Sequence, residues 1–283
     1  MKEIALMGAG GKMGQRIVTK LNVHPEYKVY CVEVDPNKIA LLEKMGAEVT
    51  SQDEALKKAD VVILAVPDRI IGQIAEEIIP KFKSQTLLVG LDPAAFFAKV
   101  VPIRQDIGYF VVHPCHPPLF GEETSPEALN DWFGGTAKQD IVCALVHGSE
   151  KDYLTGEGLA KNMFSPVRKA HRITLEQMVL LEPALCETFT LSLVDAIREG
   201  FEEVVKMGVP PDAVLGFLWG HLRIELGIVF GMAGFPVSDG AKLAMQKGKE
   251  LIFCPDWKEK IFDIKNIEKS VVEIVGKDKN IVV

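Results

Sequence analysis

The sequence has 283 residues, of which 48% are hydrophobic, and this is enough to bury a sizeable core and to form two domains. A net charge of −7 argues against a nucleic-acid-binding surface, and no apolar run reaches the roughly 18 residues that a membrane span needs. The first residues run directly into a strand and the five cysteines are irregularly spaced, so we expect no signal peptide, no disulfide framework and a cytoplasmic protein.

The first part of the chain alternates between short runs rich in β-branched residues and stretches with helical periodicity. This alternation is typical of right-handed crossovers in a parallel sheet, so we predict a Rossmann-like, mostly parallel α/β domain over residues 1–173. The predicted strands are Ile4–Met7, Val29–Val34, Val61–Val66, Thr86–Leu91, Tyr109–His113, Ile141–His147 and Pro166–Ile173. The predicted helices are Lys12–Leu21, Lys38–Met45, Asp53–Lys58, Ile70–Phe82 and Glu150–Met163.

Strand patterns stop at Leu175, and residues 174–283 are predicted to form an all-helical domain for substrate binding and dimerisation. Its first helix, Leu175–Gly200, is apolar on nearly every face, so we expect it to be buried all round, and we expect Pro183 to kink it or restart it. Because a chain of this length can hardly cover such a helix by itself, we predict a two-fold homodimer. The remaining predicted helices are Phe201–Met207, Pro211–Phe230, Gly240–Leu251, Trp257–Phe262 and Ile267–Val275.

A glycine-rich turn joins the first predicted strand to the first predicted helix. Glycines let the backbone approach a pyrophosphate, which the free N–H groups of the helix N-terminus then stabilise. The spacing departs from the usual dinucleotide fingerprint, since Met13 occupies the third position, but the strand–turn–helix context gives the motif its meaning. We predict cofactor contacts from Gly8, Gly10, Gly11, Lys12, Met13 and Gly14.

The second predicted strand leads to a carboxylate that can recognise the cofactor's ribose. Glu33 at the strand tip can accept hydrogen bonds from both adenosine ribose hydroxyls and would repel the 2′-phosphate of NADP, so we predict NAD. We favour Glu33 over Asp35, which we expect to cap the next helix. At the end of the third strand, Ala65 and Pro67 are expected to pack against the cofactor, and Asp68 is either a contact or a helix cap.

A proline-stiffened loop with two histidines follows the predicted strand Tyr109–His113. Open parallel sheets bind ligands beyond the carboxyl ends of their strands, so this loop is expected to face the nicotinamide. A stiff loop holds imidazoles in fixed positions, as proton transfer or metal binding requires. We therefore predict functional roles for His113 and His116, and the alternative is that hydrogen bonds merely satisfy both side chains.

Helical spacing places carboxylates among apolar residues in the second domain. A buried carboxylate is costly unless it is paired, protonated or bound to a cation, so we favour a function for Glu187. Glu225 and its helical neighbour His221 remain open between function and ion pairing, and Glu182 is a weaker candidate beside the expected kink. Histidines with carboxylates suit Zn²⁺ or Mn²⁺ and carboxylates alone suit Mg²⁺, so we predict metal ligation by His116 and Glu187, with His221 and Glu225 as further candidates.

Several segments together resemble one enzyme family over nearly the whole chain. They are GAGGKMG in the glycine turn, VEVDP after the second strand, LDPAA at 91–95, HPCHPPLF at 113–120, FGG at 133–135, LEQMVLLEPALCET at 175–188 and IFCPDW at 252–257. This set is similar to the D-apionate oxidoisomerases, a branch of the 6-phosphogluconate dehydrogenase-like superfamily with mechanistic kinship to ketol-acid reductoisomerase. The His-Pro pair at 113–114 is also similar to prephenate dehydrogenase.

The resemblance implies a reaction in two stages on a small branched sugar acid. NAD⁺ takes a hydride from the carbon that bears the 2-hydroxyl, and a hydroxymethyl group then migrates to give 3-oxo-isoapionate. A metal ion that bridges both oxygens would assist, with His116 and Glu187 as metal or substrate contacts and His113 as base or orienting group. The sequence lacks the dense carboxylate cluster of ketol-acid reductoisomerase, so one metal or none is open.

Two other functions remain open at this point. One is a plain NAD-dependent 2- or 3-hydroxyacid dehydrogenase of the same superfamily, which oxidises without rearrangement. The other is an NAD-binding regulatory protein that has lost catalysis. The polar groups on apolar helical faces argue against the regulatory protein, because a sensor has no need to retain them.

Overall fold

The computed structural model describes residues 1–276, which divide into two compact units. The first unit contains Met1–Pro183 together with the segment that starts at Glu268, and the second contains Ala184–Ile267. The division therefore lies inside the long helix rather than at residues 173/174. The described residues after Glu268 belong to the first unit, where Val271 of the last helix and Val275 just after it are buried.

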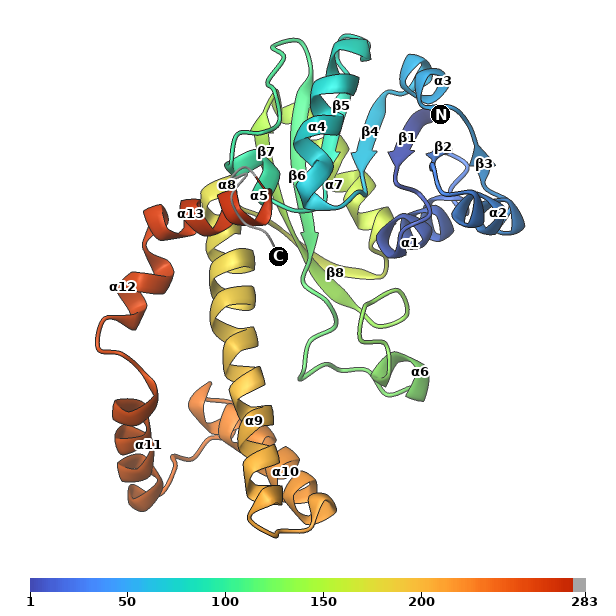
Figure 1. Ribbon diagram of the computed structural model, residues 1–283. Helices are drawn as coiled ribbons and strands as arrows, with labels where there is room; N and C mark the ends of the chain where they lie inside the picture. Colours follow the sequence, from blue (N-terminus) through green and yellow to red (C-terminus); the bar gives the residue numbers. More distant parts are fainter. Residues whose placement is uncertain (277–283) are drawn as a thin grey trace. The chain divides into compact units, whose positions relative to one another are not determined.

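An eight-stranded sheet forms the core of the first unit, with the order β3-β2-β1-β4-β5-β6-β7-β8 (Figure 1). All neighbouring strands are parallel except β6 and β7, which confirms the predicted Rossmann-like, mostly parallel sheet. The strands are β1 Lys2–Met7, β2 Tyr27–Val32, β3 Glu48–Val49, β4 Val61–Leu64, β5 Leu87–Gly90, β6 Gly108–Pro114, β7 Gln139–His147 and β8 Val167–Arg172.

The strand order reverses between β1 and β4, and such a switch point is where open sheets bind dinucleotides. Because crossovers are right-handed, α1 after β1 and α4 after β4 lie on opposite faces of the sheet (Figure 1). The helical segments of this part are α1 Lys12–Leu21, α2 Pro36–Lys44, α3 Gln52–Lys58, α4 Asp68–Ile78, the 3₁₀ turn Ile79–Lys81, α5 Ala94–Phe97, α6 Pro126–Leu129 and α7 Glu150–Met163. The sequence pattern missed β3, α5 and α6, which are too short to show a period.

The long helix after β8 is continuous from Leu175 to Lys206 and consists of three parts. They are α8 Leu175–Val179, a π-helical segment Leu180–Leu191 and α9 Ser192–Lys206. Pro183 lies inside the π-helical segment, where its missing N–H prevents regular α-helical bonding, and the helix does not restart at this proline. The prediction of a separate helix over Phe201–Met207 was wrong, because α9 continues through it.

The other helices lie in or leave the second unit: α10 Pro211–Val229, α11 Asp239–Ile252, α12 Trp257–Phe262 and α13 Ile264–Ile274. In the single chain α10, α11 and α12 bury little, and large apolar side chains of α10 such as Phe217 and Trp219 are 69% and 63% exposed. The expectation that Leu175–Gly200 is buried all round is therefore wrong for one chain, since Leu191 and Val194 are also exposed. Among the described residues, no helix has the length and hydropathy to cross a bilayer.

Candidate active site

The glycine turn between β1 and α1 requires glycine at two positions at least. Gly8 has a φ of +75°, and a Cβ there would lie 2.4 Å from the carbonyl oxygen of Ala65. A Cβ on Gly14 would lie 2.5 Å from the carbonyl oxygens of both Gly8 and Ala9. No side chain caps the N-terminus of α1 at Gly11, so the first N–H groups of the helix are left to bind an anion.

Glu33 lies against this turn, directly after β2. Its Oε2 accepts a hydrogen bond from the Gly10 N–H at 3.0 Å, and its Oε1 accepts one from the Val34 N–H at 2.8 Å. These contacts aim the carboxylate at the first turn, where the cofactor's adenosine ribose lies in a dinucleotide fold. Asp35 instead caps α2 by accepting a hydrogen bond from the Asn37 N–H at 2.8 Å. The prediction that Asp35 is a helix cap is therefore confirmed.

The residues that follow β4 lie against the other side of the glycine turn. The Ala65 N–H donates to the Met7 carbonyl at 2.9 Å, which brings Ala65 next to Gly8. Pro67 is the N-cap residue of α4, and Asp68 is the first residue of that helix. Burial and the neighbouring charge of Asp92 raise the pKa of Asp68 to about 6, so this carboxyl group titrates close to physiological pH.

An acid–imidazole cluster lies beyond the carboxyl ends of β5 and β6. His113 ends β6, Asp92 follows β5, and Glu182 comes from the long helix, all within the first unit. The His113 Nε2 atom is 3.4 Å from Glu182 Oε2, and Nδ1 is 3.9 Å from Asp92 Oδ2. One ligand atom from each residue lies within 4.8 Å of the others, which is compatible with a shared cation.

The hydrogen bonds of His113 define which of its nitrogens is open. Its Nδ1 is 2.9 Å from the carbonyl oxygen of Leu91, and because a carbonyl only accepts, Nδ1 carries the hydrogen. The other nitrogen, Nε2, therefore faces Glu182. Asp92 is held by the Ala94 N–H at 2.8 Å, and burial raises the pKa of this carboxyl group.

His116, three residues after His113, is held differently. It adopts a left-handed φ of +59°, and its Nδ1 donates to the carbonyl oxygen of Phe133 at 3.1 Å. The imidazole rings of His113 and His116 are 6.4 Å apart and nearly perpendicular. The structure thus brings the two predicted histidines together at the carboxyl edge of the sheet.

The other predicted site residues lie in the second unit. Glu187 is in the π-helical segment and is exposed, and Glu225 and His221 are exposed on α10. The His221 ring stacks on Phe217 at 3.9 Å, and its Nδ1 donates to the Phe217 carbonyl at 2.9 Å. The expectation that Glu187 and Glu225 occupy the middle of buried apolar stripes is not met in the single chain.

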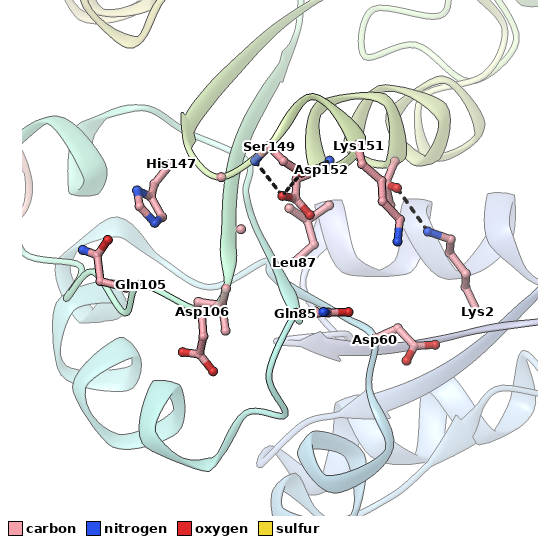
Figure 2. A pocket seen from close by; sticks show the side chains of 14 residues that line it. Lys2, Asp60, Gln85, Leu87, Gln105, Asp106, His147, Ser149, Lys151 and Asp152 are labelled. Atoms are coloured by element: carbon pink, nitrogen blue, oxygen red, sulfur yellow. Dashed lines mark hydrogen bonds between the residues drawn. The ribbon is translucent and has the colours of Figure 1, made fainter.

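A cavity of about 630 Å³ lies at the opposite edge of the sheet (Figure 2). Its wall includes Lys2 at the start of β1, Asp60 before β4 and His147 at the end of the antiparallel β7. Figure 2 also shows Ser149 and Asp152 at the N-terminus of α7, joined to each other by hydrogen bonds. None of the residues predicted as cofactor or catalytic contacts lines this cavity.

Comparisons with known proteins agree with this geometry. Residues 3–91 match the family model "NADP oxidoreductase coenzyme F420-dependent", and residues 121–275 match "Phosphogluconate dehydrogenase (decarboxylating) C-term". A D-apionate oxidoisomerase from Cupriavidus necator is 44% identical over 97% of this chain and 100% of its own length. The chain belongs to the D-apionate oxidoisomerase family. The resemblance inferred from the sequence motifs is confirmed.

Two solved structures place the fold in the same group. A semialdehyde dehydrogenase NAD-binding protein from Cupriavidus necator, in complex with calcium and NAD, is 44% identical, with a TM-score of 0.93 over 97% of this chain and 100% of its own. An NADH-preferring ketol-acid reductoisomerase from an uncultured archean is 23% identical, with a TM-score of 0.67 over 99% of this chain and 84% of its own. At that identity the second likeness shows the fold alone.

Sequence reasoning did not assign a role to Asp92 and ranked Glu182 low. Asp92 belongs to the LDPAA segment and directly follows a predicted strand, as Glu33 does. The rule that carboxyl ends of parallel strands share one edge would have found it. For Glu182, the only signal in the sequence was its position directly before Pro183. Its approach to His113 depends on the path of the long helix.

Proposed function

We propose that this protein is an NAD-dependent oxidoisomerase that converts D-apionate to 3-oxo-isoapionate, by oxidation of the 2-hydroxyl group followed by migration of a hydroxymethyl group. Membership of the D-apionate oxidoisomerase family supports the substrate and the reaction. The observation that carries the proposal in this chain is the cluster of Asp92, His113 and Glu182 at the edge of the sheet where a dinucleotide fold presents its nicotinamide.

The residues of the turn fit NAD. Side chains at Gly8 and Gly14 would collide with backbone, so this stretch keeps the close approach that a pyrophosphate needs, and the uncapped start of α1 supplies donors. Glu33 adds a carboxylate for the ribose hydroxyls and against a 2′-phosphate. When bound, NAD⁺ supplies the hydride acceptor for the oxidation. Gly10, Gly11, Lys12 and Met13 complete the proposed contacts, with Ala65, Pro67 and Asp68 on the facing wall.

His113 and Glu182 are placed to take the proton from the 2-hydroxyl group. Because Nδ1 of His113 donates to Leu91, a neutral imidazole presents its lone pair at Nε2, on the side of Glu182. The proton removed from the hydroxyl can then be shared between Nε2 and the carboxylate at 3.4 Å. His116 lies beside this pair and is our candidate for a contact with the substrate oxygens.

With the lone pair of His113 Nε2 used as a ligand rather than as a base, the same cluster fits a divalent cation. Two carboxylates and one imidazole suit Mn²⁺ or Zn²⁺, and also Mg²⁺ with water as additional ligands. Such an ion would act as a Lewis acid toward the substrate oxygens, as the migration of a carbon group next to a ketone requires. The related protein from Cupriavidus necator was solved with calcium and NAD, which supports a cation in this family. Glu187, His221 and Glu225 stay candidates for the metal or the substrate.

The decisive experiment incubates the full-length protein with NAD⁺ and a panel that contains D-apionate and linear sugar acids. We expect NADH absorbance with D-apionate and a rearranged carbon skeleton by NMR. An unrearranged oxo acid would identify a plain hydroxyacid dehydrogenase, and NADH formation with none of the acids would favour the regulatory protein. Asp92→Asn and Glu182→Gln should each lower kcat by about 10²-fold or more, whereas Glu176→Gln, an exposed acid on α8, should not.

The metal and the remaining acids have separate tests. Elemental analysis and activity after chelation report on the cation, and full activity of a metal-free sample would remove it from the proposal. Metal affinity that falls in Asp92→Asn but not in Glu187→Gln would locate the ion in the cluster. The reverse result would favour the ligand pair His116 and Glu187 that the sequence predicts.

We also propose a homodimer formed by the helical unit. Among its described residues, α9 and α11 bury no side chain in the single chain, and Phe217, Trp219 and Phe230 are mostly exposed. Exposed apolar patches of this kind mark protein interfaces. Light scattering should give twice the mass of the chain, and Trp219→Glu should shift the protein toward monomer. A monomeric wild-type protein at working concentration would contradict the proposal.

A further inference from the structure

The loop between β6 and β7 is fastened to helix α1 through backbone carbonyls. Arg16 on α1 donates from Nη1 to the Phe133 carbonyl at 2.8 Å, and Lys20, one turn later, donates to the Gly135 carbonyl at 2.7 Å. The Phe133 carbonyl also accepts the hydrogen bond from His116 Nδ1 at 3.1 Å. One oxygen atom therefore joins Arg16 to the imidazole of His116.

The placement of Arg16 is energetically unfavourable in itself. Its Nε and Nη2 are buried and have no hydrogen-bond partner in the described chain, and burial lowers the pKa of the guanidinium despite the charge of Asp131. The guanidinium lies 5.1 Å from the Phe133 ring centroid and 5.4 Å from that of Phe164, which offsets only part of this cost.

The shared Phe133 carbonyl determines which ring nitrogen of His116 carries the hydrogen. Because the Phe133 oxygen only accepts, Nδ1 of His116 carries a hydrogen, and the neutral ring keeps its lone pair on Nε2. The same ring packs on Phe133 with centroids 5.3 Å apart, and the backbone of His116 is left-handed, so the loop must be held firmly to keep this arrangement.

We propose that Arg16 is a positioning residue for the oxidation, which acts through the Phe133 carbonyl to hold His116 with Nε2 open toward the substrate. Helix α1 begins at the glycine turn, so the contact also fixes the imidazole relative to the element that holds the pyrophosphate. This inference rests on the proposed function in assigning a substrate contact to His116, but the hydrogen-bond network can be tested without activity.

The kinetic test compares Arg16→Met, Arg16→Lys and Lys20→Met. Lys20→Met is the matched control, because it removes a bond from the same helix to the same loop without touching the carbonyl that His116 uses. Arg16→Met should lower kcat by about 10- to 100-fold with KM for NAD⁺ nearly unchanged, Arg16→Lys should recover part of the loss, and Lys20→Met should stay within about 2-fold of wild type. Equal losses in Arg16→Met and Lys20→Met would overturn the proposal.

A double-mutant cycle with His116→Gln separates positioning from general damage. If Arg16 acts through His116, Arg16→Met should change the kcat of the His116→Gln variant by less than about 2-fold. A full additional loss in that background would refute the coupling. Melting temperatures of all variants show whether they fold. If Arg16→Met does not fold, the same cycle is measured with Arg16→Lys.

The spectroscopic test needs no turnover. In protein labelled with ¹⁵N-histidine, His116, assigned through His116→Gln, should show the Nδ1–H tautomer in wild type and in Lys20→Met. Arg16→Met should shift it toward the Nε2–H form that free histidine prefers. An unchanged tautomer in Arg16→Met would overturn the proposal. If D-apionate is not oxidised but the tautomer shifts as expected, the proposed function fails and the positioning contact stands.

Discussion

Replacement of Asp140 by Asn should destabilise the protein at neutral pH and have little effect in acid. Asp140 on β7 accepts hydrogen bonds from Arg168 Nε at 2.8 Å and Nη2 at 3.1 Å, and its Oδ2 lies 2.8 Å from His171 Nε2. These partners, Arg168 above all, lower the pKa of the Asp140 carboxyl from 3.8 to about 2. The backbone carbonyl of Asp140 also accepts a hydrogen bond from the N–H of Cys115, in the histidine loop, at 2.9 Å.

The sign and size of the effect follow from this pKa. A carboxyl group whose pKa is lower in the folded state stabilises the fold above its unfolded value of 3.8, and the stabilisation is lost as the pH falls through about 2. A shift of nearly two pH units corresponds to about 2.5 kcal/mol. Since the Arg168 side chain is 57% exposed, solvent screens part of the pairing, and we expect about 1 to 2 kcal/mol at pH 7.

Urea denaturation of wild type and Asp140→Asn at fixed protein concentration measures this difference. The midpoints should differ at pH 7, their difference should begin to shrink below pH 3.8, and it should vanish only as the pH falls through about 2, where the wild-type carboxyl group becomes protonated in the folded state. The backbone bond to Cys115 does not depend on the side chain, so kcat should change little. A difference that stays constant from pH 7 to pH 3 would show that packing, not charge, is responsible, and the reasoning from the pKa would be wrong.

Three further predictions concern the nucleotide-binding unit. Gly14→Ala should weaken NAD binding by about 10-fold or more in calorimetry, because the added Cβ meets two carbonyl oxygens at 2.5 Å. Unchanged affinity would contradict the proposal that the glycine turn binds the pyrophosphate. Glu33→Gln should lower the ratio of kcat/KM for NAD over NADP, and an unaltered ratio would remove Glu33 from cofactor selection. Burial raises the pKa of both Cys31 and Cys143 to about 12, so neither should react with a thiol reagent in the native protein at pH 7, while exposed Cys254 should; mass mapping that finds Cys31 modified would refute this.

The sequence predicted the parts of the fold that depend on local patterns. The glycine turn and Glu33 were found because a strand, a turn and a helix stand next to one another along the chain, and α1, α7 and α12 were predicted with the bounds that the structure has. His113 and His116 were predicted because a single loop carries both. Asp92 was not assigned and Glu182 was only a weaker candidate, because their approach to His113 joins segments far apart in sequence, and no local period reports such a contact.

The prediction for Glu187 depends on a regular α-helix. An apolar stripe around Glu187 requires 3.6 residues per turn from Leu180 to Val194, but the segment Leu180–Leu191 is π-helical, with bonds from residue i to i+5. The wider turn changes which residues share a face, so the stripe read from the sequence does not exist over that stretch. The signal was present in Pro183, which removes one donor in the middle of the helix. A proline in a long apolar helix is thus a reason to suspend a periodicity argument.

The acidic groups of the candidate site outnumber its basic groups, so the site needs a bound cation to balance their charge. Asp92 and Glu182 flank His113, and Asp68 is a further acid whose pKa is raised by burial and by the charge of Asp92. Burial raises the pKa of both Asp68 and Asp92, so ionisation of this group is unfavourable without a compensating cation. A divalent ion together with the positive nicotinamide of NAD⁺ would balance these carboxylates. The acids would therefore favour binding of the oxidised cofactor over the reduced one.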